Sequence, residues 1–228
     1  MERLIKVRVE FFFQIKGAIN SGRNTMVNNK LNFEPWIGRN YSESAERLLL
    51  FGESHYINEG ENDDHNFTTE VIKNHLAKEE MRTPFFETID LLFTNDAEQK
   101  EFWDRIAFAN LIQKGFATAL DQPSLEDIAT VAPSFYTLLN LLQPTKVVVL
   151  SKRMWNYWLP EGNGRQVGSI VEGKLKVDVW KYEYDGGFCL AVGIKHPSRI
   201  WGNKQIQERK SLLNTFSNKT TNQVTTDK

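Results

Sequence analysis

Four short, almost continuously apolar runs constrain the fold of this 228-residue chain more than any other feature of its sequence. Strands that keep one face in water alternate apolar and polar residues, whereas parallel strands buried on both faces read as unbroken apolar runs. We therefore predict four buried strands that lie side by side in one sheet. Their predicted ranges are 47–51, 106–112, 146–150 and 188–194.

The segments between these runs are predicted to form helices. Residues 134–142 place apolar side chains three and four positions apart, which buries one face of a helix. Ser124 and Asp127 form a capping-box pattern that predicts a helix start, and Pro133 interrupts the segment that follows. Further helices are predicted over 68–78 and 205–216.

The last apolar run is predicted to follow a hairpin. Residues 174–184 alternate in character, and Asp185-Gly186-Gly187 is a turn sequence. Strands that alternate with helices predict an α/β fold, a three-layer α/β/α sandwich with a short, mainly parallel sheet. We expect one such domain over residues 1–217 and a disordered polar tail over 218–228.

Composition excludes several classes of protein. Hydrophobic residues make up 40% of the chain, which excludes wholesale disorder. The 28 Lys and Arg residues against 29 Asp and Glu residues exclude a globally basic nucleic-acid binder, although a local basic face remains open. No apolar run approaches the roughly 20 residues of a membrane span, so we expect no contact with a membrane.

Cysteine and histidine usage argue against a metal centre. Cys189 is the one cysteine, which excludes a disulfide framework, a four-cysteine zinc site and a cysteine-ligated iron–sulfur cluster, and which fits a cytoplasmic location. His55, His65 and His75 recur at intervals of ten, whereas metal-binding histidines usually lie three to five residues apart. We therefore predict no metal ligands.

Polar residues stand at or just after the ends of all four predicted strands. Because ligand sites in open α/β sheets lie outside the carboxyl ends of the strands, we expect these residues to converge. In chain order they are Gly52-Glu53-Ser54-His55-Tyr56, Asn110, Ser151-Lys152-Arg153 and Lys195-His196-Pro197-Ser198-Arg199.

The order and spacing of these motifs resemble the uracil-DNA glycosylase superfamily over about residues 47–216. That family has a first motif Gly-x-(Asp, Asn or Ala)-Pro-(Tyr or Gly) and a strand that ends in a base-reading Asn. A later strand ends in a small residue with a cation, and the final His-Pro-Ser motif is followed by a wedge residue. His196-Pro197-Ser198 is the most specific of the matches.

The resemblance implies a DNA glycosylase, which flips a base out of DNA and hydrolyses its N-glycosidic bond. By position, His196 would stabilise the departing base and Asn110 would read its edge. A carboxylate would stabilise the cation that develops on the sugar, and Glu53 is the preferred candidate. The implied partner is DNA, and the implied enzyme is a monomer that uses neither a metal nor a cofactor.

The remaining matched positions would bind the nucleotide and the DNA strand. Gly52 would let the backbone approach the nucleotide, and Tyr56 matches a tyrosine that bars a 5-methyl group in some members. Ser198 would hold a phosphate, and Ile200 falls at the position of the wedge. The cations expected to line the DNA path are Lys152, Arg153, Lys195 and Arg199.

The first motif departs from the family pattern. Ser54 falls where the best-known members keep a water-activating Asp or Asn, and His55 replaces the proline. Glu53 matches members that carry a Glu one place earlier, although those usually hold an iron–sulfur cluster. The departure predicts an altered base, such as a modified pyrimidine of a phage genome, and hence a role in defence. The acidic loop over 58–65 is a lid, a specificity element or an insertion.

Two alternative functions remain open. The same fold could bind DNA or a nucleotide without cleaving it, because the first motif lacks its usual acid. A serine hydrolase is the other, since Gly52-Glu53-Ser54-His55 approaches a nucleophile elbow. Ser54 would then act with His196 and with Asp178 or Asp185 as the acid, although Tyr56 replaces the second glycine of the elbow.

Overall fold

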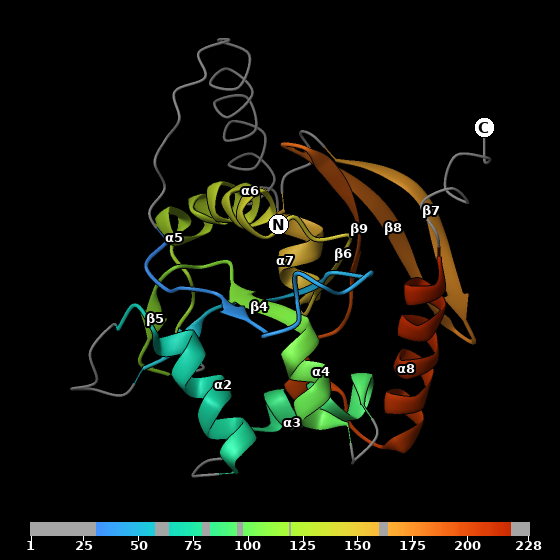
Figure 1. Cartoon of the computed structure of the whole chain (residues 1–228), viewed down its shortest axis with the longest axis horizontal. Helices are drawn as coiled ribbons and strands as arrows, with labels where there is room; N and C mark the ends of the chain where they lie inside the picture. Colours follow the sequence, from blue (N-terminus) through green and yellow to red (C-terminus); the bar gives the residue numbers. More distant parts are fainter. Residues whose placement is uncertain are drawn as a thin grey trace. The chain divides into compact units, whose positions relative to one another are not determined.

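A seven-stranded sheet in the order β1-β4-β2-β6-β9-β8-β7 forms the centre of the structure (Figure 1). The structure is a computed structural model that describes residues 31–57, 64–78, 83–94, 98–118, 120–159 and 164–219. The described residues belong to one compact unit. Of the predicted tail, residues 220–228 lie outside them, as do residues 58–63 of the acidic loop.

The four middle strands are parallel and correspond to the four apolar runs. The prediction of a parallel core is therefore confirmed, with ends that differ by one or two residues. In sheet order the strands are β4 (Ile106–Asn110), β2 (Leu48–Gly52), β6 (Lys146–Val149) and β9 (Gly187–Gly193). Asn110 is thus the last residue of its strand, not an interior one.

The outer strands are antiparallel, so the sheet is longer and more mixed than predicted. The predicted hairpin is confirmed between β8 (Leu175–Tyr184) and β9. The sequence did not predict β7 (Gly164–Glu172), whose pairing with β8 is interrupted by a bulge between Gln166 and Gly168. On the other edge, β1 (Trp36–Ile37) pairs with β4. A separate two-stranded sheet joins β3 (His55–Tyr56) to β5 (Gly115–Phe116).

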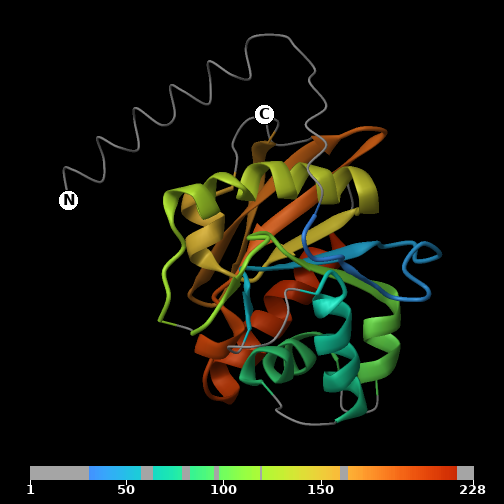
Figure 2. The ribbon, with the colours of Figure 1, turned by 90° about the vertical axis from the view of Figure 1, so that its left-hand side faces the viewer.

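Helices cover both faces of the sheet (Figure 2). Leu50 of β2 packs into a core with the helices on one face, and its neighbours Leu49 and Phe51 pack into a second core on the other face. The first face carries α2 (Phe67–Ala77), α3 (Pro84–Phe93), α4 (Gln99–Arg105) and α8 (Asn203–Asn218). The second carries α5 (Leu125–Ala129), α6 (Val131–Leu142) and α7 (Lys152–Tyr157).

Local sequence signals explain where several helices begin. Ser124 and Asp127 form the predicted capping box at the start of α5. Pro133 does not interrupt the next helix, because it falls in the first turn of α6, where a missing backbone N–H removes no helical hydrogen bond. No helix within the described ranges is both long enough and apolar enough to cross a membrane.

The amino edge of the parallel strands is tied to the end of the last helix. Lys146, the first residue of β6, is buried, and its Nζ donates to the carbonyl oxygens of Phe216 at 2.7 Å and Lys219 at 2.6 Å. The last carbonyl groups of a helix have no partner within it, so this ammonium group caps α8. Burial lowers the pKa of Lys146.

Candidate functional site

The carboxyl ends of the four parallel strands lie level with one another. Gly52 at the end of β2 pairs with Asn110, and Phe51 pairs with Val149 of β6. The chain passes from β2 to β4, which is the neighbour of β2 on one side. It later passes from β4 to β6, which is the neighbour of β2 on the other side. The switch point therefore lies between β2 and β6, which is where open α/β sheets bind their ligands.

Glu53 stands at this switch point with both carboxylate oxygens occupied. Ser151, directly after β6, donates its hydroxyl to Oε2 at 3.1 Å. Arg153 forms an ion pair with Oε1. The Glu53 side chain is only 13% exposed. A largely buried carboxylate that accepts two hydrogen bonds has a fixed orientation, and Glu53 has this arrangement.

Arg153, which begins the first turn of α7 with Lys152, is itself held by three groups. Besides Glu53, its guanidinium donates to Gln122 Oε1 at 2.7 Å. It also stacks over the ring of Trp158, with the central carbon 4.7 Å from the ring centroid. Such cation–π stacking orients a planar guanidinium. The partners Ser151, Gln122 and Trp158 were not singled out for this role by the sequence, because nothing in their spacing marks them.

His196 follows β9 and precedes a short 3-10 helix, η1 (Pro197–Arg199). Its ring packs against Phe85 of α3, with centroids 5.1 Å apart. Burial lowers the pKa of His196, and the negative charge of Glu53 opposes that effect in part. The imidazole is therefore neutral at pH 7, and the predicted neighbourhood of His196 and Glu53 is present in the structure.

Asn110 and Gly52 are cross-strand neighbours at the same edge. A Cβ atom on Gly52 would overlap Oδ1 of Asn110, so the close approach of this side chain is what requires a glycine. Within the described residues the Asn110 amide group makes no hydrogen bond, and it is not among the fully enclosed atoms that lack a partner. Asn110 lies at the carboxyl edge of the sheet but is only 4% exposed.

Tyr56 and Ser54 complete the first motif. Tyr56 is 54% exposed, and its partial burial together with the charge of Glu53 raises its pKa. His55, between them, points away into the core, where Nε2 lies 2.8 Å from Oγ1 of Thr68. Because side chains alternate along β3, Tyr56 faces solvent while His55 packs in the core.

The arrangement expected of a serine hydrolase is not found among the described residues. No hydrogen bond joins Ser54 to His196 there. Asp185 lies in the turn before β9, whose seven residues separate it from His196 by roughly 20 Å. Asp178 lies beside Lys152 instead. Neither acid is among the charges that act on His196.

One of the predicted DNA-contacting side chains lies elsewhere than the sequence indicates. Ile200 is 4% exposed and packs into the core, so its prediction as a projecting wedge is wrong. The turn of η1 directs the next residue outward instead, and Trp201 is 74% exposed. Its indole Nε1 donates to the carbonyl oxygen of Ser198 at 2.8 Å, which fixes the ring on the surface.

The four predicted cations also differ in their surroundings. Lys152 is half-buried next to Asp178, and burial lowers its pKa. Lys195 is half-buried too, with Nζ 3.5 Å from Gln205 Oε1. Arg153 is engaged by Glu53. Arg199 is exposed, and no ion pair of its guanidinium is found within the described residues.

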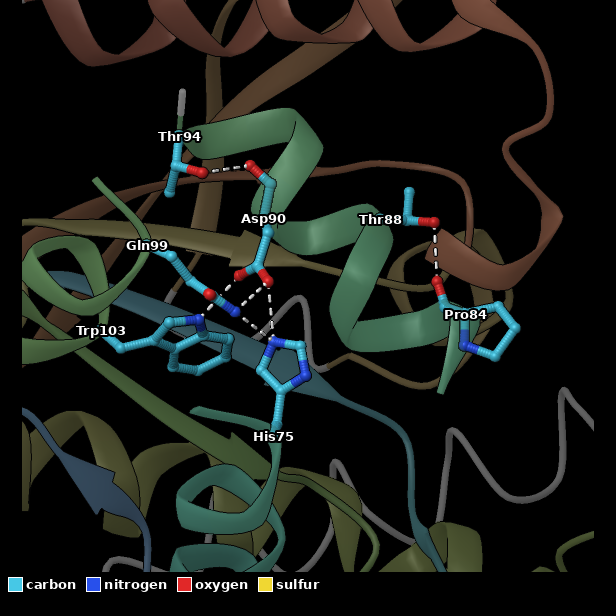
Figure 3. A network of polar contacts seen from close by, with 7 residues as sticks. All are labelled: His75, Pro84, Thr88, Asp90, Thr94, Gln99 and Trp103. Atoms are coloured by element: carbon cyan, nitrogen blue, oxygen red, sulfur yellow. Dashed lines mark hydrogen bonds and ion pairs between the residues drawn. The ribbon is translucent and has the colours of Figure 1, made fainter. Parts of the chain in front are cut away.

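A second polar cluster lies between the helices of the first face (Figure 3). Asp90 of α3 accepts hydrogen bonds from Trp103 Nε1 at 2.8 Å, Gln99 Nε2 at 2.6 Å and His75 Nε2 at 2.7 Å. His75 Nδ1 is the one enclosed side-chain polar atom without a partner in the described part of the chain. A cavity of about 370 Å³ borders the cluster. No sequence pattern marks this cluster, because His75 and Asp90 lie on different helices.

Neither cluster has the composition of a metal site. No group of three or more His, Cys, Asp or Glu side chains that could hold a metal ion occurs in the described ranges. His65 pairs with Glu34 at 3.1 Å, and its other ring nitrogen lies 2.7 Å from the carbonyl oxygen of Asn32.

The sequence matches no protein-family model, and no curated protein matches it either. Functional interpretation therefore depends on the groups at the carboxyl edge of the sheet.

Proposed function

We propose that this protein is a DNA glycosylase that hydrolyses the N-glycosidic bond of a flipped, modified pyrimidine and leaves an abasic site. The observation that carries the proposal is the placement of three groups at the carboxyl ends of three of the four parallel strands: the fixed carboxylate of Glu53, the neutral imidazole of His196 and the amide of Asn110. The proposal includes membership of the uracil-DNA glycosylase superfamily, with its three-layer α/β/α fold.

Each of these groups meets a need of the reaction. Cleavage of the bond places positive charge on the sugar and negative charge on the base. Glu53 stabilises the sugar cation and takes a proton from the water that adds to the anomeric carbon. The neutral ring of His196 donates a hydrogen bond to a carbonyl oxygen of the departing base. The amide of Asn110 offers one donor group and one acceptor group to the edge of the base.

Contact with DNA is assigned to the exposed part of the loop around η1. Arg199 would pair with a phosphate, and the hydroxyl of Ser198 would bind the next one. Trp201, rather than Ile200, presents the apolar surface that fills the gap left by a flipped base. Since the net charge of the chain is −1, we expect this contact to be local.

The base is proposed to be a modified pyrimidine because the first motif differs from the usual one. Ser54 stands in place of the acid or amide, and Glu53 carries the charge one position earlier. Tyr56 borders the same region with an exposed ring. Modified pyrimidines occur in some phage genomes, so a role in defence against phage follows as part of this proposal.

An abasic-site assay tests the function directly. Purified protein is incubated with uracil-containing DNA, unmodified DNA and hypermodified phage DNAs, and alkali-sensitive abasic sites are counted. We expect cleavage on one substrate class, a loss of about 100-fold or more in His196→Ala, and a larger loss in Glu53→Gln than in Ser54→Ala. Glu101→Gln, at an exposed acid of α4 away from the site, serves as the control and should retain the full rate.

Two results would contradict the proposal. A fully active His196→Ala variant would remove the role of this residue. Tight, salt-dependent binding to DNA without abasic sites on any substrate would instead identify a binding module of the same fold.

A further inference from the structure

Arg153 was expected to contact the DNA backbone, yet its guanidinium is already engaged by the protein. One terminal nitrogen pairs with Glu53 and the other donates to Gln122. The plane of the group lies over Trp158. A cation that serves mainly to attract phosphate is usually free to move toward it, as the exposed Arg199 is.

The carboxylate of Glu53 depends on this guanidinium for its orientation. A glutamate side chain has three rotatable bonds, so its carboxylate would otherwise occupy several positions. Ser151 restrains Oε2 and Arg153 restrains Oε1, which leaves the carboxylate plane fixed relative to β2 and β6. Because the Glu53 side chain is 13% exposed, water has little access to replace either partner.

Gln122 and Trp158 in turn hold Arg153 from two different segments of the chain. Gln122 belongs to the segment before α5, and Trp158 caps the end of α7. The hydrogen bond to Gln122 and the stacking on Trp158 restrict a side chain that is still 43% exposed. The result is a chain of contacts that runs from two surface segments to one carboxylate.

We propose that Arg153 is a positioning residue that acts on the reaction through Glu53 and is not a contact to a DNA phosphate. This inference rests on the proposed glycosylase function, because it assumes that Glu53 acts on the substrate. It assigns the binding of phosphate to Arg199. Loss of Arg153 should therefore lower kcat, whereas loss of Arg199 should weaken DNA binding.

The test separates catalysis from binding. For Arg153→Met we expect kcat to fall about 100-fold, the scale of a misplaced catalytic group. KM and the Kd for an uncleaved DNA should change less than about 2-fold, and the salt dependence of binding should stay the same. Arg199→Met should instead weaken binding and lower the salt slope by about one. Arg165→Met, an exposed arginine on β7, is the matched control and should change neither quantity.

Rescue and a double variant show whether Arg153 acts through Glu53. Arg153→Lys keeps the charge next to Glu53 but not the fork that reaches Gln122, so kcat should lie between the wild-type and Arg153→Met values. In a Glu53→Gln background, Arg153→Met should cause no further loss. If Arg153→Met does not fold, Gln122→Ala removes one tether at the surface and should lower kcat several-fold at constant KM.

Weaker DNA binding with a smaller salt slope in Arg153→Met, or a further loss of kcat in the Glu53→Gln background, would overturn the inference. If the wild-type protein binds DNA but makes no abasic sites, the proposed function fails. The binding measurement then still decides whether Arg153 contacts a phosphate, with an unchanged salt slope supporting its assignment to Glu53.

Discussion

Replacing Asp90 by alanine should destabilise the fold strongly, although this residue lies outside the candidate site. Its carboxylate is the common acceptor for side chains from two other helices: His75 of α2, and Gln99 and Trp103 of α4. These helices all belong to the connection between β2 and β4 (Figure 3). The substitution leaves three donors without an acceptor and removes a charge that each of them stabilises.

The expected magnitude follows from the burial of the three donors. Trp103 is completely buried, so its Nε1–H would lose its partner with no water to replace it, at a cost of about 1–3 kcal/mol. The His75 side chain is 6% exposed and should cost a similar amount, whereas Gln99 borders the cavity and can reach water. The total is about 2–6 kcal/mol, which corresponds to a fall in Tm of roughly 4–24 °C for a chain of this size.

Urea unfolding followed by tryptophan fluorescence measures this loss. The control is Glu101→Ala, which removes an exposed acid of α4 that pairs with Arg105 and should cost less than about 0.5 kcal/mol. Trp103→Phe should cost less in the Asp90→Ala background than in the wild-type protein, because the donor it removes is already unpaired. An Asp90→Ala protein within about 1 kcal/mol of wild type would refute the argument, as would equal costs of Trp103→Phe in both backgrounds.

Two further predictions concern other parts of the fold. Burial lowers the pKa of His55 from 6.5 to about 4. The unfolded state therefore takes up a proton that the folded state resists, and stability should fall by up to about 3 kcal/mol between pH 7 and pH 4 through this residue. Urea unfolding at both pH values should show a smaller difference in His55→Gln, and an equal difference would contradict the assignment. In Gly193→Ala the added methyl group would overlap the Trp155 side chain, so the substitution should cost about 1–3 kcal/mol in thermal unfolding. An unchanged Tm would show that α7 shifts freely to make room.

The central strands could be predicted from the sequence because strands buried on both faces appear as unbroken apolar runs. Their ends could not be predicted as well. Leu111 and Ile112 are fully buried but lie beyond the last paired residue of β4, so the apolar run is longer than the strand. The strand β7 has no clear pattern in the sequence because a bulge interrupts its alternation, and Ile170 is its one fully buried residue.

The candidate site was predictable to the extent that it depends on strand order. Glu53, Asn110 and His196 follow or end parallel strands, and the register of the sheet brings such positions to one edge. The direction of a side chain in a loop depends on local turns that the sequence pattern does not reveal. For this reason the exposed position after the His-Pro-Ser motif was assigned to Ile200 instead of Trp201.

The two edges of the parallel sheet hold different kinds of interaction, and this division affects how the protein can change over evolutionary time. At the amino edge, the ammonium group of Lys146 ties a central strand to the end of α8, so substitutions there alter folding. At the carboxyl edge, the groups that would meet a ligand lie in loops outside the strand ladder. Substitutions at the carboxyl edge can therefore change ligand binding during evolution, while the opposite edge maintains the stability that tolerates them.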